Sequence, residues 1–165
     1  MESVKMSGIN IRRAAIGDYT GVSALMDELH RLHVEARPDV YRELQTRMSH
    51  KEYEQLLKAD HRFLYVAEWL DQGEIVGYAS AQLNVIENVE LLKDRRMLYL
   101  NEIIVGSNHR GHGTGKLLMQ ELIELGKGIQ VDSVELTVST FNTGAQAFYE
   151  QLGLAVRSSR MEYIL

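Results

Sequence analysis

Three glycines at alternate positions, Gly111, Gly113 and Gly115, stand directly before a helix-like apolar run in the stretch HRGHGTGKLLMQEL. Backbone N–H groups converge where such a loop opens a helix, and the helix dipole adds roughly half a positive charge there. Glycine also permits backbone angles that a Cβ would forbid. The sequence therefore predicts an anion-binding loop over residues 111–116.

Two well-known phosphate-binding patterns do not fit this loop. A P-loop requires GxxxxGK followed by Ser or Thr, whereas this chain lacks the leading glycine and has Leu117 after Lys116. The dinucleotide-binding pattern GxGxxG, counted from Gly111, puts Lys116 where the third glycine belongs. The loop therefore matches neither pattern, and another phosphate-bearing ligand has to be considered.

Helical periodicity predicts the elements that would position this loop. We expect helices after Asp18, over residues 51–60, after the glycine loop and after Asn142. Pro38 separates the first two helices, because it pushes Arg37 out of helical geometry. The apolar stripes are Val22, Leu25, Leu29 and Leu32, then Leu118, Leu122 and Leu125, and finally Ala145, Phe148 and Leu152.

Strands are expected where apolar residues alternate or run continuously. The segments are INIRRA, FLYVAEWL, EIVGYASAQL, MLYLNEIIV, VELTV and the closing MEYIL. The run MLYLNEIIV is nearly continuous, as is typical of a strand covered on both faces. The order is strand, two helices, three strands, helix, strand, helix, strand, which predicts an α/β (α+β) fold with helices packed on a mixed sheet.

Composition limits the function classes. A chain of 165 residues with 45% hydrophobic content fits one domain over residues 1–165. The absence of cysteine excludes disulfides and thiolate chemistry and favours a cytoplasmic location. A net charge of -5 disfavours nucleic-acid binding. No apolar run is long enough to span a membrane, and the start MESVKMSGIN lacks the features of a signal peptide, so we expect no membrane partner.

The pattern RGxGxG, formed by Arg110 and the three glycines after a strand ending in Val105, resembles the coenzyme A pyrophosphate loop of the GNAT family of N-acetyltransferases. The stretch NTGAQAFYEQLGL is similar to a second signature of that family, with key positions at Asn142, Ala145, Phe148, Tyr149 and Gly153. The opening and closing strands agree as well. The resemblance therefore spans essentially the whole chain and implies the GNAT fold, in which homodimers are frequent.

The resemblance implies acetyl transfer from acetyl-CoA to a primary amine of a small molecule or peptide, by direct attack through a tetrahedral intermediate. An exposed strand edge at residues 103–105 would pair with the pantetheine arm, and the Val105 N–H would donate to the oxyanion. Tyr149 would protonate the leaving thiolate, unless it is an ordinary residue at the edge of the core. The residues expected to bind acetyl-CoA are Ile103, Ile104, Val105, Arg110, Gly111, His112, Gly113, Thr114, Gly115, Lys116, Asn142 and Tyr149.

Glu102 is the best candidate for the group that accepts a proton from the amine. It is the only carboxylate in LNEIIV, because Asn101 stands where some relatives carry a Glu. A carboxylate inside so apolar a run is costly unless it is paired. Glu102 is therefore either the general base or a structural residue held by a neighbouring strand or helix.

A polar cluster follows the first expected helix, in a part of the chain that often walls the acceptor site in this family. From it we expect His30, His33 and Glu35 to contact the substrate, together with Asn101, and a solvated helix end is the alternative. The histidine pairs at 30 and 33 and at 109 and 112 lack a nearby third ligand, so we expect no metal site.

The sequence is compatible with two functions. One is an acetyl-CoA-dependent N-acetyltransferase, and the other is a non-catalytic CoA-binding or regulatory module on the same fold. Tyr149 favours the enzyme. The acceptor is not identified, because an acidic chain favours polyamines or lysine side chains only weakly.

Overall fold

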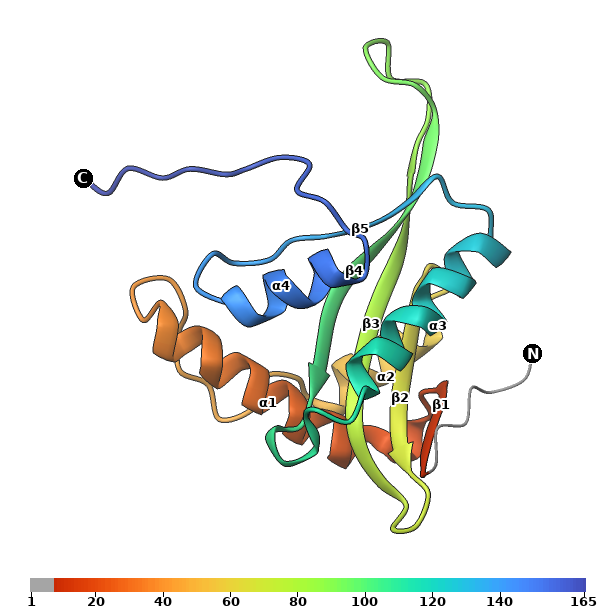
Figure 1. Ribbon diagram of the computed structural model, residues 1–165, viewed down its shortest axis with the longest axis vertical. Helices are drawn as coiled ribbons and strands as arrows, with labels where there is room; N and C mark the ends of the chain where they lie inside the picture. The colour runs from red at the N-terminus through yellow and green to blue at the C-terminus, as the bar shows by residue number, and fades with distance from the viewer. Residues whose placement is uncertain (1–7) are drawn as a thin grey trace.

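Five strands lie side by side in sequence order, β1-β2-β3-β4-β5, in this computed structural model, which describes residues 8–165 (Figure 1). They are β1 (Ile9–Arg13), β2 (Arg62–Trp69), β3 (Glu74–Ile86), β4 (Arg95–Val105) and β5 (Ser133–Leu136). The first four pair antiparallel, and β5 pairs parallel to β4. The expected mixed sheet is confirmed. Residues 1–7, on which the expectation of no signal peptide largely depends, lie outside the described part of the chain.

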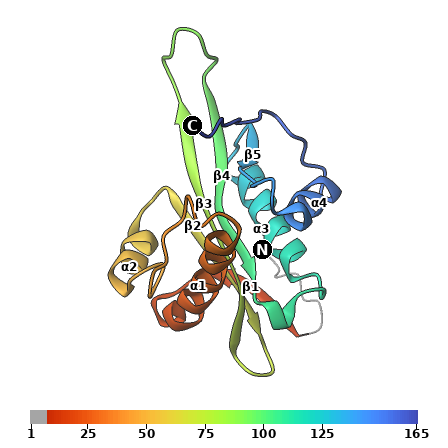
Figure 2. The same ribbon diagram turned by 90° about the vertical axis from the view of Figure 1, so that its left-hand side faces the viewer.

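Helices cover both faces of the sheet (Figure 2). α1 (Tyr19–Ala36) and α2 (His50–Lys58) pack on one face, and α3 (Thr114–Gly128) and α4 (Thr143–Gln151) pack on the other. Short 3-10 turns, η1 (Ile16–Asp18) and η2 (Ser107–His109), precede α1 and the glycine loop. All four expected helices are confirmed. Among residues 8–165, no helix combines the length and apolar composition that a bilayer crossing requires.

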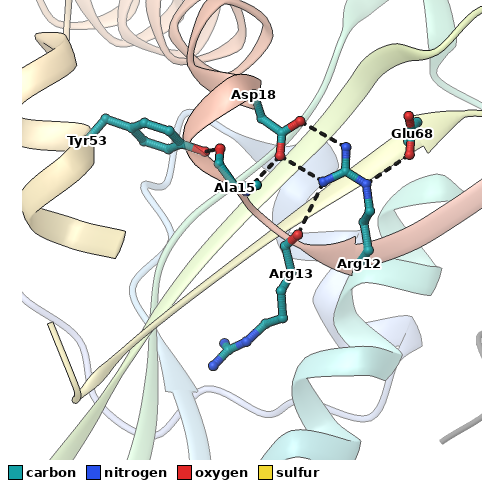
Figure 3. A network of polar contacts seen from close by, with 6 residues as sticks. All are labelled: Arg12, Arg13, Ala15, Asp18, Tyr53 and Glu68. Carbon is teal, nitrogen blue, oxygen red and sulfur yellow. Dashed lines mark hydrogen bonds and ion pairs between the residues drawn. The ribbon is translucent and has the colours of Figure 1, made fainter. Parts of the chain in front are cut away.

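A buried polar network fixes the start of α1 (Figure 3). The Arg12 guanidinium donates to both carboxylate oxygens of Asp18, at 2.8 and 2.9 Å, and to Glu68 at 2.8 Å. Asp18 also accepts the Ala15 N–H at 2.8 Å, and the Tyr53 hydroxyl donates to the Ala15 carbonyl at 2.9 Å. Asp18 is the N-cap residue of α1, but its side chain makes no capping hydrogen bond to that helix. Asp18 instead binds Arg12 of β1 and the Ala15 N–H, and through these two residues the network connects β1 with β2 and α2.

A reciprocal capping box starts α2. The Ser49 hydroxyl accepts the Glu52 N–H at 3.3 Å, and the Glu52 carboxylate accepts the Ser49 N–H at 2.7 Å. The box satisfies two backbone donors at the helix start that would otherwise have no partner. The weaker helix expected over residues 51–60 forms because of this box and because Tyr53 is fully buried.

One extra residue in β4 changes which side chains face which helices. Ser80 pairs with Glu102 and Ala81 pairs with Leu100, so Asn101 has no partner on β3 and forms a β-bulge. Before the bulge, Leu98 and Leu100 belong to the cluster under α3. After it, residues 103 and 105 pack against that cluster, while residue 104 joins the cluster under α1. The bulge thereby directs Glu102 toward the α1–α2 layer.

The closing strand expected over MEYIL is absent, and this expectation is wrong. Residues 152–165 form no helix or strand, and the chain runs away from β5 as an extended tail (Figure 1). Met161 and Tyr163, on one face, are 93% and 88% exposed, and Ile164, on the other, is 76% exposed, so neither face of the segment is covered. A strand needs a hydrogen-bonding neighbour and a covered face, and apolar composition alone supplies neither.

Candidate active site

The outer edge of β4 is open over its last five residues. β5 pairs with β4 only at Met97–Leu100, so residues 101–105 have no ladder partner on that side within the described chain. The Gly106 N–H donates to Val76 on β3 at 2.9 Å. Since successive N–H groups of a strand point to opposite edges, the Val105 N–H points away from β3 and toward the open edge. This backbone can accept an extended ligand as an added strand.

The glycine loop leads from this edge into α3. Gly111 and Gly113 have φ values of 81° and 79°, a left-handed conformation that glycine adopts without a steric penalty. Gly113 is the N-cap residue of α3, and the first backbone bond of the helix runs from Leu117 to its carbonyl at 3.1 Å. The N–H groups of residues 114–116 therefore have no intrahelical acceptor and are available to an anion.

Thr114 is buried at the first turn of α3. The residue is 2% exposed, and its hydroxyl has no hydrogen-bond partner among the residues that the structure describes. A buried hydroxyl without a partner is costly. Gly115 lies against α4, since a Cβ there would be in van der Waals contact, at 3.4 Å, with the ring of Phe148.

Arg110 and Lys116 contribute positive charge to the loop in different ways. The Arg110 guanidinium donates to the Val105 carbonyl at 3.0 Å and to Glu28 of α1 at 2.9 Å. Glu28 also accepts the Ser107 N–H at 3.1 Å. Lys116 is exposed on the first turn of α3. Arg110 thus holds the loop against β4 and α1, and Lys116 is the cation that is directed to solvent.

Tyr149 lies on the α3–α4 side of the sheet. Its ring packs against the core cluster under α3 and lies 5.3 Å from the Phe148 ring, centroid to centroid. Burial raises the pKa of the Tyr149 phenol to about 12. The phenol is therefore protonated at neutral pH and can act as a proton donor. Asn142 starts this helix, because its side chain accepts the Ala145 N–H at 3.1 Å.

Glu102 faces the opposite side of the sheet, where it lines a cavity of about 420 Å³ between the α1–α2 layer and the strands. Its side chain is 24% exposed, and its carboxylate lies 3.8 Å from the Arg47 guanidinium. Burial raises the pKa of Glu102, against the opposing charges of Arg47 and Arg62. A carboxyl group with a raised pKa is a better proton acceptor, so this position suits a general base.

The comparison with known families decides the classification. The model of the acetyltransferase (GNAT) family matches residues 26–154, from within α1 to just past α4. The chain belongs to the GNAT acetyltransferase family. The family resemblance of the glycine loop and of the stretch at residues 142–154 is therefore confirmed.

Individual GNAT relatives agree with this assignment. An uncharacterized N-acetyltransferase of Methanocaldococcus jannaschii is 36% identical over 98 residues, which cover 59% of this chain and 41% of that protein. The chain thus spans less than half the length of this relative. A mutant of the BH1408 protein from Bacillus halodurans has a TM-score of 0.91 at 29% identity, over 94% of this chain and 98% of that one. The aminoglycoside N-acetyltransferase AAC(6')-Iy in complex with CoA has a TM-score of 0.71 at 19% identity, over 94% and 98% of the two chains, which shows a shared fold.

The structure of this GNAT domain brings some of the expected substrate residues to the Glu102 cavity and leaves others elsewhere. Asn101 is next to the cavity, where it accepts a 2.8 Å hydrogen bond from Arg62. His30 bonds to the Arg42 carbonyl at 2.7 Å and His33 to the Leu29 carbonyl at 2.8 Å, and neither lines the cavity.

Glu35 also lies apart from Glu102. It lines a second cavity of about 340 Å³, beside Glu28, Arg31 and Arg110. His33 packs edge-on against Tyr41 and Phe141, with centroids 5.1 and 5.6 Å apart. The polar cluster at the end of α1 therefore consists of helix-end contacts around His33, and Glu35 alone lies beside the glycine loop.

Two arginines of the Glu102 cavity are absent from the residues expected from the sequence. Arg47 lies in a connection without periodicity, where no pattern marks it. Arg62 begins β2, and a charged residue at the start of an apolar strand is a signal that could have marked it. Both become candidates only when the sheet places β2, β4 and the α1–α2 connection around one cavity.

Proposed function

We propose that this GNAT domain transfers an acetyl group from acetyl-CoA to a primary amine of a small molecule or peptide by direct attack. The observation that carries the proposal is the open edge of β4, where the Val105 N–H points outward beside the first turn of α3. A strand edge and an anion-binding helix start, placed next to each other, suit a ligand that is extended and amide-rich at one end and has a pyrophosphate at the other.

Residues of the loop and of β4 fit coenzyme A. The free N–H groups of residues 114–116 would bind the pyrophosphate oxygens. Residues 103–105 would bond to the pantetheine amides, and the Val105 N–H would stabilise negative charge on the carbonyl oxygen under attack. Acetyl-CoA supplies the thioester: the amine forms the new C–N bond to give a tetrahedral intermediate, and the C–S bond breaks when this intermediate collapses and releases the CoA thiolate.

Two side chains on opposite sides of β4 would move the protons. Glu102, on the α1–α2 side, would accept the proton that the amine loses. Tyr149, on the α3–α4 side, would donate its phenolic proton to the leaving thiolate. This placement brings the acceptor amine from one side of the strand and the cosubstrate from the other.

A thiol-release assay tests the proposal. Purified protein and acetyl-CoA are mixed with polyamines, amino acids, aminoglycosides, aromatic amines and N-terminal peptides, while calorimetry measures acetyl-CoA binding. We expect acceptor-dependent thiol release with at least one class. Tight binding of acetyl-CoA without thiol release from any acceptor would favour the alternative, a non-catalytic CoA-binding or regulatory module.

The proposal extends to a cytoplasmic location and a homodimer. The cysteine-free composition supports the first and the family resemblance supports the second. Light scattering during gel filtration measures the assembly, and a mass of one chain at micromolar concentration would exclude the dimer.

A further inference from the structure

The cavity that holds Glu102 has a distinctive set of charges. Its charged and titratable lining consists of Arg47, Glu52, His61, Arg62, Tyr78 and Glu102. These residues come from the connection after α1, from α2, from the connection before β2 and from three strands. Segments that are distant in sequence therefore line one cavity. The charged side chains of this lining that have no neutralising partner favour some acceptors over others.

Arg62 is held in place by its neighbours on the sheet. One of its terminal nitrogens donates to the Asn101 side chain at 2.8 Å, and Asn101 in turn donates to Gln82 at 3.4 Å. Gln82 donates onward to Asn84 at 2.8 Å. A guanidinium carries five N–H donors, and this single bond leaves most of them available to a ligand. Arg62 is thus a positioned donor group in the cavity wall.

The second arginine of the cavity is also available to a ligand. Arg47 lies 3.8 Å from Glu102, which is too long for a hydrogen bond, and its side chain is 44% exposed. The backbone N–H of Arg47 is anchored by Asp27 at 2.6 Å, so its chain position is fixed while its guanidinium is free to adjust. An adjustable arginine beside a fixed one can bind two oxygens of the same anion.

The two carboxylates of the cavity do not neutralise these arginines equally. The backbone N–H and the hydroxyl of Ser49 both donate to one oxygen of Glu52 at 2.7 Å, so this oxygen caps α2 while the carboxylate keeps its negative charge near Arg47. Glu102 remains as the carboxylate that faces both arginines, and it is the proposed acceptor of the amine proton. An incoming ammonium group would meet the Glu102 carboxylate, and an incoming anion would meet two guanidiniums that retain unused N–H donors.

We infer that the acceptor is a small amine that also carries an anionic group, which Arg47 and Arg62 bind while the amine faces Glu102. This inference rests on the proposed function. The anion is a carboxylate, as in an amino acid, or a phosphate, as in an amino-sugar or amino-alcohol phosphate, and both present oxygens in a geometry that arginine recognises. A cavity of about 420 Å³ fits a small molecule. Polycationic acceptors such as polyamines and aminoglycosides are disfavoured by the arginine pair.

Matched acceptors test the inference directly. The twenty amino acids, as one mixture, are compared with the mixture of their amides, and 2-aminoethyl phosphate is compared with 2-aminoethanol, with spermidine as the polycation. We expect acceptor-dependent thiol release to be at least tenfold faster with the anionic member of one pair, and the preferred pair distinguishes carboxylate from phosphate. Equal or faster release with the neutral members or with spermidine would overturn the inference while leaving the acetyltransferase intact.

Arginine variants connect the preference to these two residues. For the preferred pair, Arg62→Gln should lower the ratio of kcat/KM between the anionic and the neutral acceptor by about tenfold to a hundredfold. Arg47→Gln should lower it by about threefold to tenfold, because the side chain is 44% exposed. The ratio of the two kcat/KM values is the readout, because a change in the pKa of Glu102 caused by the loss of an arginine would affect both acceptors alike.

The control is Arg42→Gln, since the Arg42 side chain is exposed and lies outside the cavity. In Arg42→Gln the ratio of kcat/KM between the anionic and the neutral acceptor should match that of the parent protein. A preference that survives in both Arg47→Gln and Arg62→Gln would overturn the inference. Binding of acetyl-CoA with no thiol release from any acceptor would instead overturn the proposed function, and the inference would fall with it.

Discussion

Glu102 and Tyr149 lie on opposite sides of β4, and one residue determines the side on which Glu102 lies. Asn101 forms the bulge that shifts the alternation of β4, so that Glu102 faces the cavity with Arg47 instead of the apolar cluster under α3. A register shift of one residue reverses the facing of every later side chain in a strand. The bulge therefore determines that the Glu102 carboxylate faces the polar cavity and not the apolar core.

At this scale the first prediction concerns the proton donor. Tyr149→Phe removes the phenolic proton and keeps the ring that packs beside Phe148. Turnover should fall by roughly tenfold to a thousandfold, while the Kd for acetyl-CoA stays nearly constant. Steady-state thiol release and calorimetry measure the two quantities. Unchanged turnover would remove Tyr149 from the mechanism.

The second residue-scale prediction is a pH profile. Burial raises the pKa of Glu102, so the carboxylate form that accepts a proton is lost as the pH falls through that raised value. The parent enzyme should show an acidic limb in kcat/KM that lies above the usual carboxyl range. Glu102→Gln should abolish that limb and lower kcat/KM by about a hundredfold or more. If Glu102→Gln keeps the same limb, Glu102 is structural and another group is the base.

The glycine loop belongs to the scale of elements, because its backbone joins β4 to α3. Gly113 has a φ of 79° at the N-cap of α3, so Gly113→Val adds both strain and a branched side chain where the pyrophosphate would lie. We expect the affinity for acetyl-CoA to fall at least tenfold in a protein that remains folded by circular dichroism. Gly73→Val is the matched control, since Gly73 has a φ of 64° in the β2–β3 turn with open space around it. Equal affinity in both variants would contradict the phosphate assignment.

The network at the start of α1 predicts how stability depends on pH. Hydrogen bonds from Arg12 lower the pKa of Asp18, so its ionised form contributes stability above the unfolded pKa of about 4, and that contribution is lost as the pH falls through the lower folded value. Asp18→Asn should therefore reduce the unfolding free energy by about 1–3 kcal/mol at pH 7, with a smaller difference at pH 3. Urea unfolding at the two pH values measures this. A loss of the same size at both would mean that ionisation of Asp18 is not the cause.

Elements with a strong local signal could be predicted from the sequence, and the rest depended on long-range contacts. α3 follows from its glycine loop and the Leu118–Leu122 stripe, and α4 from the cap at Asn142. The bulge at Asn101 could not be predicted, because it is a difference of one residue between two paired strands. The closing strand was expected from apolar residues alone, without a neighbour to pair with.

At the scale of the whole molecule, the sheet separates the region proposed to bind acetyl-CoA from the region proposed to bind the acceptor. The α3–α4 side and the open edge of β4 carry the features that suit coenzyme A, and the α1–α2 side carries the cavity with Glu102, Arg47 and Arg62. The family motifs lie in the first region, so the sequence indicated the acetyl donor. The second region is assembled from segments that share no motif, so of the proposed acceptor site the sequence indicated Glu102 and Asn101, and Arg47 and Arg62 could be recognised only in the folded chain.

The most direct measurement is a single-turnover reaction with isotope-labelled acetyl-CoA and an acceptor found in the thiol-release assay, followed by mass spectrometry of the small molecules and the intact protein. Direct transfer predicts that the labelled N-acetyl amine and free CoA appear in equal amounts, and that the mass of the protein never increases by an acetyl group. Free CoA without the labelled amine, or label retained on the protein as an intermediate, would contradict direct transfer to the amine.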